Sequence, residues 1–247
     1  MLKDNRFFNI AERVLYEDNH IIMINKLPGE IVQADKTGDA SMLDDVKAYL
    51  KAKYHKPGNV FLGLPHRIDR PTSGIVLFAR TDKALSRLSE MFRTGQIDKY
   101  YWAVADRSLP SASGELVHYI YRDTVKNKSF AFKPAPDGGI PDLHGVKKSE
   151  LQLARLRYEQ IGQSDRYVLL NIELLTGRHH QIRAQLAACG AHIKGDLKYG
   201  FPRSESNGGI CLHSHEMSFV HPVSKETIHI TARPPEERIW SVFDLTL

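Results

Sequence analysis

Apolar and polar residues alternate in short runs along this chain, and the runs predict more strands than helices. The apolar run 21–25 follows a strand-like segment at 13–16 and precedes Pro28-Gly29, a pair that is typical of turns. β-branched and aromatic residues dominate the later runs. Further strands are therefore predicted at 75–79, 97–105, 115–121, 151–158, 167–174, 211–219 and 227–232.

Three other segments have the spacing of helices. Ser41 and Asp44 form a capping-box pattern ahead of apolar residues three and four positions apart, which predicts a helix of about three turns. Thr81 and Gly95 bracket a second helix in the same way, and residues 180–188 form a third.

The order of these elements indicates the fold class. Residues 162–165 have the composition of a hairpin turn, and the basic stretch 123–148 is expected to be a long loop or an irregular hairpin. Because hairpins connect most strands, we expect an α+β fold with a mixed, largely antiparallel sheet and helices packed on it. We see no linker and no internal repeat in the 247 residues, so we expect a single domain over 1–247.

Charge and cysteine usage narrow the class of protein. Lys plus Arg number 34 against 29 for Asp plus Glu, and the net charge of +5 favours a polyanionic partner, although a basic protein without such a partner has the same balance. Cys189 and Cys211 form neither a disulfide framework nor a CxxC motif, and no apolar run resembles a signal peptide or a membrane span. We therefore expect a soluble cytoplasmic protein, and no nucleotide cofactor, because GxGxxG and GxxxxGK[ST] are both missing.

The densest chemistry lies in the segment 66–74. One carboxylate, Asp69, stands between Arg67 and Arg70, with His66 nearby, on a loop that leads into a buried strand. Neighbouring cations favour the charged form of a carboxylate, which suits a nucleophile or an electrostatic stabiliser better than a general acid. On local physics alone, a salt-bridged turn is the more frequent outcome.

A second polar cluster, 176–183, follows a predicted strand and opens a helix. Backbone amides at a helix start, with Arg178 and Arg183, make an anion site for a phosphate or for a carboxylate such as Asp69. The alternative is a solvated basic helix face.

A metal site deserves comparison because seven of the twelve histidines follow Arg178, including His179-His180 and His213-Ser214-His215. No HExxH is present, and no spacing combines a helical pair of ligands with a nearby cysteine or carboxylate set. We expect no metal, and a metal hydrolase remains the weaker alternative.

Together the motifs resemble one family. His66-Arg67-Ile68-Asp69-Arg70-Pro71-Thr72-Ser73-Gly74 is similar to the HRLDRxTSG signature of the RluA-type pseudouridine synthases, and Gly177-Arg178-His179-His180-Gln181-Ile182-Arg183 resembles their GRxHQIR motif. Supporting matches are 22–29, 99–101, 193–200, Leu212-His213 and His221-Pro222. The resemblance covers nearly the whole chain and implies the pseudouridine synthase catalytic fold.

The resemblance also implies roles for individual residues. Asp69 would be the catalytic carboxylate and Arg183 its ion-pair partner. Tyr101 would stack on the target uracil and is a candidate base, and Arg67 would fill the space of the flipped base. The remaining residues predicted to bind substrate are His66, Arg70, Arg178 and Gln181.

The expected function is that of an RNA pseudouridine synthase, an isomerase that converts uridine to pseudouridine in structured ribosomal or transfer RNA. Substrate and product are isomers, so no cofactor is expected, and we expect a monomer. Many relatives carry an N-terminal S4 domain, and here we expect none, which leaves RNA recognition to the catalytic domain. The lysines expected to contribute are Lys126, Lys128, Lys147 and Lys148. The alternative, a catalytically silent RNA-binding protein on the same fold, has no need of Asp69.

Overall fold

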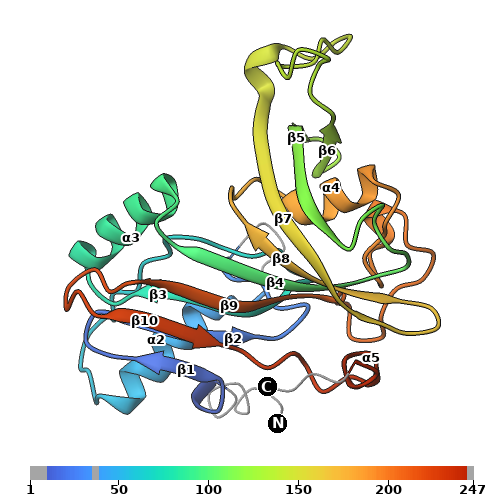
Figure 1. Ribbon diagram of the computed structural model, residues 1–247. Coiled ribbons are helices and arrows are strands. Elements are labelled where there is room, and N and C mark those ends of the chain that lie inside the picture. Colours follow the sequence, from blue (N-terminus) through green and yellow to red (C-terminus); the bar gives the residue numbers. More distant parts are fainter. Residues whose placement is uncertain (1–9, 35–38, 244–247) are drawn as a thin grey trace. The chain divides into compact units, whose positions relative to one another are not determined.

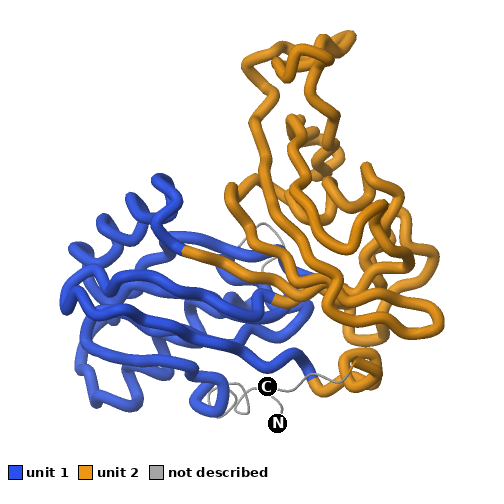
Figure 2. The backbone as a smooth tube through the Cα atoms, in the orientation of Figure 1, with its two compact units in different colours: residues 1–97, 214–235 blue, residues 98–213, 236–247 orange. Residues whose placement is uncertain are grey.

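The computed structural model describes residues 10–34 and 39–243, which belong to two compact units (Figures 1 and 2). Unit 1 comprises residues 1–97 and 214–235, and unit 2 comprises 98–213 and 236–247. The prediction of a single domain stays a prediction, because compactness alone does not decide whether units fold independently. Residues 1–9, which belong to the stretch searched for a signal peptide, lie outside the described residues.

Unit 1 is a sheet with helices from the first 94 residues of the chain. Its sheet order is β1-β2-β3-β9, with β10 paired to β9, and the pairs β1–β2, β2–β3 and β9–β10 are antiparallel. The strands are β1 (Val14–Glu17), β2 (Ile21–Lys26), β3 (Ser73–Ala79), β9 (Leu212–Val220) and β10 (Thr227–Thr231), and the helices are α2 (Met42–Lys53) and α3 (Asp82–Thr94).

Strands β2 and β3 are buried on both faces, which explains why they read as continuous apolar runs. Ile22 and Phe78 belong to a core cluster with the buried residues of α2, whereas Met23 and Leu77 belong to a second cluster with those of α3. Successive side chains of a strand point to opposite faces, so each helix takes alternate residues of the same two strands. The loop that enters β3 is thereby attached to a rigid support.

Gly74 is required by the close approach of two strands in unit 1. Its φ is +107°, and a Cβ at this position would lie 2.2 Å from the backbone oxygen of Ser214. Any larger residue would have to push β3 and β9 apart while adopting a backbone conformation that side chains disfavour. The glycine that ends the 66–74 motif therefore has a structural reason.

Unit 2 is a second run of antiparallel strands in the order β4-β8-β7-β5-β6. In Figure 1, β7 projects from this sheet toward the segment 133–150. The strands are β4 (Asp98–Ala105), β5 (Ser113–Asp123), β6 (Lys128–Phe132), β7 (Leu151–Gln163) and β8 (Val168–Leu174). The helices are α4 (Gln181–Ala188), α5 (Arg238–Ser241) and the 3₁₀ turns η1 (Lys148–Glu150) and η2 (Leu197–Tyr199).

The side chains of β4 alternate between the two faces of the sheet in unit 2, and only those on the face covered by α4 can take part in a site there. Tyr101 packs in a cluster with Ile182 and Leu186 of α4, whereas its neighbour Trp102 packs in another cluster with Trp240 of α5. Tyr101 and α4 therefore share one face of unit 2, and Trp102 belongs to the other.

The predicted α+β class and the mostly antiparallel pairing are confirmed. Two outcomes are predicted for the stretch 123–148, a long loop or an irregular hairpin. The structure shows the hairpin, because this stretch contains β6, which pairs with β5 from Asp123 and Lys128 onward. β7 runs to Gln163, five residues beyond the predicted end, and α5 was not predicted. No helix among the described residues is long and apolar enough to cross a membrane.

Candidate functional site

The loop 66–74 presents Asp69 from between two buried anchors in unit 1. Ile68 packs into the core cluster of β2, β3 and α2, and Thr72 is 2% exposed. The backbone N–H of Thr72 donates to the carbonyl of Asp69 at 3.0 Å, which closes a tight turn. Asp69 is half-buried, and Arg67 is exposed and makes no hydrogen bond or ion pair within the described residues. The buried side chains of Ile68 and Thr72, on either side of Asp69, thus fix the position of the carboxylate on the loop.

Lys26, the last residue of β2, hydrogen-bonds to the backbone of this loop. Its side chain is fully buried, and its Nζ donates to the carbonyls of Leu27 at 3.0 Å, Arg70 at 2.9 Å and Thr72 at 2.6 Å. All three protons of a lysine ammonium therefore have acceptors. Two of those carbonyls belong to residues one and three positions after Asp69, so the side chain of Lys26 restrains the backbone that carries the carboxylate.

Replacing Lys26 by Met is expected to change how stability depends on pH. Burial lowers the pKa of Lys26 from 10.5 to about 7, so between these values the unfolded wild-type chain binds more protons than the folded one. Its free energy of unfolding should therefore gain a contribution that rises with pH across this window, and this contribution should be missing in Lys26→Met. Urea unfolding of both proteins at several pH values measures the difference, and parallel curves would contradict the assignment to Lys26.

His66 and Arg70, both predicted to bind substrate, are used by the fold of unit 1. His66 Nε2 accepts the backbone N–H of Leu77 at 2.9 Å, and its ring stacks on Phe92 with centroids 4.4 Å apart. Arg70 Nε donates to the carbonyl of Gly29 at 3.0 Å, and its Nη2 pairs with an exposed carboxylate at 2.9 Å. Both side chains brace the loop, and a contact of either with RNA stays a prediction.

In unit 2, Arg183 is buried on α4 and paired with Asp196, a residue for which the sequence predicted no role. Its Nε and Nη2 donate to the two carboxylate oxygens of Asp196 at 2.7 and 2.8 Å. The side chains of Arg183 and Asp196 are 5% and 1% exposed. The guanidinium carbon also lies 4.9 Å from the ring centre of Tyr199. A carboxylate and an aromatic ring therefore set the position of this guanidinium.

Arg178 and Gln181 stabilise the turn before α4. The side-chain oxygen of Gln181 accepts from the hydroxyl of Thr176 at 2.8 Å and from the backbone N–H of Arg178 at 3.0 Å. Its amide nitrogen donates to the carbonyl of Arg155, and Arg178 Nε donates to the carbonyl of Leu153, both at 3.0 Å. Gln181 is 3% exposed, whereas Arg178 is exposed. An RNA contact of either residue stays a prediction.

The predicted site residues thus fall into two sets. Asp69 belongs to unit 1, while Tyr101 and Arg183 belong to unit 2. The pairing of Arg183 with Asp69 stays a prediction. Sequence reasoning overlooked Lys26 and Asp196 as site supports, although both stand inside stretches that matched the family, 22–29 and 193–200.

His215 and His221, two of the histidines near the C-terminus, contact different residues. His215 is buried, its Nδ1 contacts the carbonyl of Ala232 at 2.9 Å, and burial lowers its pKa. His221 is buried near Asp18, and burial likewise lowers its pKa. Within residues 10–34 and 39–243, no three His, Cys, Asp or Glu side chains gather in a way that could hold a metal ion.

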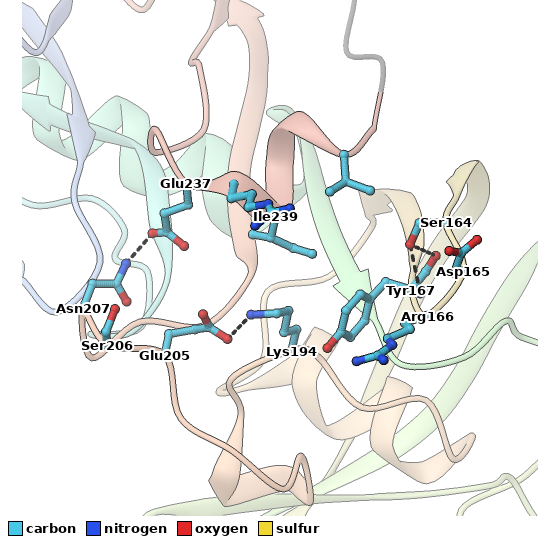
Figure 3. A pocket seen from close by; sticks show the side chains of 12 residues that line it. Ser164, Asp165, Arg166, Tyr167, Lys194, Glu205, Ser206, Asn207, Glu237 and Ile239 are labelled. Carbon is cyan, nitrogen blue, oxygen red and sulfur yellow. Dashed lines mark hydrogen bonds and ion pairs between the residues drawn. The ribbon is translucent and has the colours of Figure 1, made fainter.

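Unit 2 also has a pocket of about 720 Å³ that contains none of the predicted site residues (Figure 3). Lys194 pairs there with Glu205, and Asn207 donates to Glu237. Burial opposes the charge of Lys194, but the hydrogen bond that Lys194 donates to Glu205 prevails and raises the pKa of Lys194, while burial raises the pKa of Glu237. Its wall is formed by residues 164–167, 194, 205–207, 237–239 and 242.

Comparison with known proteins places the chain among RNA-modifying enzymes. Residues 20–188 match the family model described as RNA pseudouridylate synthase. The chain is 30% identical over 236 residues to tRNA pseudouridine synthase C of Haemophilus influenzae, covering 91% of this chain and 93% of that protein. It is 32% identical over 241 residues to ribosomal large subunit pseudouridine synthase C of Buchnera aphidicola, covering 92% of this chain and 69% of that protein.

A solved structure agrees in fold. Human RNA pseudouridylate synthase domain containing 4 superimposes with a TM-score of 0.76 over 93% of this chain and 91% of that chain, at 21% sequence identity. The comparisons give no support to the catalytically silent alternative.

Proposed function

Because the chain belongs to the RNA pseudouridylate synthase family, an isomerase family that acts on RNA, we propose that it converts uridine to pseudouridine in ribosomal or transfer RNA, with Asp69 as the catalytic carboxylate. The observation that carries the proposal is the half-buried Asp69 on a loop tied down by Lys26, in the motif that resembles the family signature. An adjacent exposed guanidinium, that of Arg67, supports it.

The proposed reaction exchanges one bond to the ribose for another. The N1–C1′ bond of uridine breaks, the uracil rotates, C5 joins C1′, the C5 proton leaves and N1 gains a proton. Breaking the bond develops positive charge on the sugar, which an ionised Asp69 stabilises, captures covalently or relieves by taking the C2′ proton. Atoms and electrons balance without any oxidant, reductant or nucleotide.

The target base must leave its stack before any group can reach C1′. Tyr101 is the proposed stacking platform and base, and Arg67 the side chain that fills the vacated space. Arg183 is the proposed ion-pair partner of Asp69. A guanidinium can stack on the neighbouring bases and hydrogen-bond to the vacated partner, which offsets part of the cost of flipping.

Positive side chains in unit 2 are the proposed contacts with the rest of the RNA. Lys126 lies in the turn between β5 and β6, and Lys147 and Lys148 lie at the start of η1, just before β7; all three are exposed. Lys128 lies over the ring of Tyr199, with its Nζ 5.0 Å from the ring centre. Lysines placed this way bind phosphates without reading the base sequence.

We propose that the protein acts as a monomer in the cytoplasm.

The Tyr101→Phe variant separates stacking from proton removal. The variant keeps the ring within the apolar cluster it shares with α4 but loses the hydroxyl. We expect it to bind RNA as wild type does, while product formation slows by about 100-fold, the contribution typical of a positioned base. Single-turnover rates and a filter-binding isotherm measure the two quantities. A fully active variant would restrict Tyr101 to stacking.

The proposed function is tested by release of tritium from RNA whose uridines carry the label at C5. Purified protein is expected to release tritium from unmodified ribosomal or transfer RNA transcripts, in the absence of any added nucleotide. Release of no tritium from any stable RNA would contradict the proposal.

A further inference from the structure

Arg183 occupies a prepared position in unit 2. Its two contacts with Asp196 form a bidentate pair that engages the Nε and Nη2 edge of the guanidinium, and both side chains are almost fully buried. Pairs of this geometry fix the direction of the guanidinium plane as well as its distance. Any carboxylate met by the Nη1 edge therefore meets a group whose orientation is already determined.

Tyr199 limits the guanidinium from a second direction and is itself anchored. Its hydroxyl accepts the backbone N–H of Ser129 at 2.8 Å and contacts Nδ1 of His180 at 3.0 Å. Tyr199 is 6% exposed, and its ring centre lies 4.9 Å from the guanidinium carbon of Arg183. A ring held at its polar end has little freedom to move away from the cation.

Asp196 is anchored by the backbone around η2. Its carbonyl accepts the N–H of Tyr199 at 3.1 Å and of Phe201 at 3.0 Å, and its own N–H donates to Ile193 at 3.0 Å. The same short turn therefore supplies both the carboxylate and the aromatic ring. This explains why the two residues stand three apart in the sequence, since one 3₁₀ turn separates them.

From this arrangement we infer that Asp196 and Tyr199 are positioning residues for the reaction, and that they act by holding the Arg183 guanidinium in its productive orientation. The inference rests on the proposed function, in which Arg183 supports Asp69. An arginine side chain has several rotatable bonds, and misplacement of a catalytic group by about 1 Å is sufficient to lower a rate about 100-fold. Removing the support is therefore expected to affect turnover while leaving RNA binding nearly unchanged.

The Asp196→Asn variant gives the sharpest test. Asparagine keeps the size of the side chain but replaces one acceptor by a donor, so the bidentate contact with Nε and Nη2 is lost. We expect kcat to fall about 10- to 100-fold, with KM for RNA within about threefold because few phosphate contacts change. The Tyr199→Phe variant keeps the ring and loses only its anchors, so its kcat should fall less.

The matched control is Asp106→Asn. Asp106 is also a carboxylate of unit 2, and it accepts the backbone N–H of His192 at 2.8 Å and contacts His192 Nδ1 at 3.1 Å. It has no part in the proposed site, so its kcat per folded molecule should stay at the wild-type value. Asp196→Glu, which restores the carboxylate, should recover part of the kcat lost in Asp196→Asn.

A double-mutant cycle with Arg183→Lys decides whether Asp196 acts through Arg183. Activity is expressed per folded molecule, with the folded fraction from circular dichroism. If Asp196 works by orienting Arg183, its substitution should cost little once Arg183 is already Lys, and the two effects should be strongly non-additive. Additive effects, or a kcat for folded Asp196→Asn equal to wild type, would overturn the inference.

The result stays separable from the proposed function. Wild-type protein that forms no pseudouridine would refute the proposed function, whereas an active wild type with an unaffected Asp196→Asn variant would refute only the inference. If Asp196→Asn fails to fold, Tyr199→Phe carries the comparison, and a wild-type kcat in folded Tyr199→Phe would overturn the inference.

Discussion

Asp69→Asn is expected to lower the rate of pseudouridine formation by about four orders of magnitude, a loss comparable to that seen when other enzymes lose a catalytic carboxylate. Asparagine has nearly the same shape but carries no negative charge to stabilise or capture the sugar cation. The surrounding loop keeps its supports, because the Asp69 carbonyl that accepts from Thr72 is backbone and the Lys26 contacts go to other carbonyls. RNA affinity should therefore stay within a few-fold.

Tritium release under single-turnover conditions and a binding isotherm at fixed salt measure the two quantities. Salt is held constant because counterion release alone changes RNA affinity. Asp82→Asn, which removes an exposed carboxylate from the first turn of α3 in the same unit, should behave as wild type. Appreciable turnover by homogeneous Asp69→Asn protein would show that another group performs the chemistry.

Arg183→Ala is expected to abolish activity and also to destabilise unit 2. The substitution leaves the carboxylate of Asp196, which is 1% exposed, without its bidentate partner. Removing one member of a buried ion pair typically costs about 3–5 kcal/mol, because an uncompensated charge stays buried. Activity is thus expected to fall because Asp69 loses its proposed partner, whereas stability is expected to fall because the charge of Asp196 is left uncompensated.

The double variant Arg183→Ala, Asp196→Asn separates these causes. Removing the second charge should restore part of the free energy of unfolding, since the uncompensated carboxylate is gone, but it should restore no activity. Urea unfolding and tritium release are measured on both proteins. If activity returned together with stability, Arg183 would be a structural residue and its proposed role with Asp69 would be wrong.

The strands of unit 1 were predictable because burial on both faces leaves a plain signal. Residues 21–24 and 75–79 are continuous apolar runs, and in the structure their alternate side chains pack in two core clusters, one with α2 and one with α3. The extent of β7 was less predictable, because its last residues, Glu159 to Gln163, are mostly exposed and follow no apolar alternation. The four-residue α5 has too few turns for any periodicity to show.

The candidate site shows the limit of motif reasoning. The motifs identified Asp69 and Arg183 by their residue types, but not what holds them, since Lys26 lies 43 positions before Asp69 and Asp196 lies 13 positions after Arg183. Such supports depend on hydrogen bonds that only the folded backbone brings into range. The same limit applies to Gln181, which the motif presents as a substrate ligand and the fold uses as an internal brace.

The central claim, that this chain makes pseudouridine in RNA, is tested most directly by mapping pseudouridine in all stable RNAs of cells that lack the gene and carry either the wild-type gene or its Asp69→Asn form. The account predicts that at least one uridine of ribosomal or transfer RNA is modified with the wild-type gene and unmodified with the Asp69→Asn form. Identical maps from the two strains, with both proteins present in equal amounts, would contradict it.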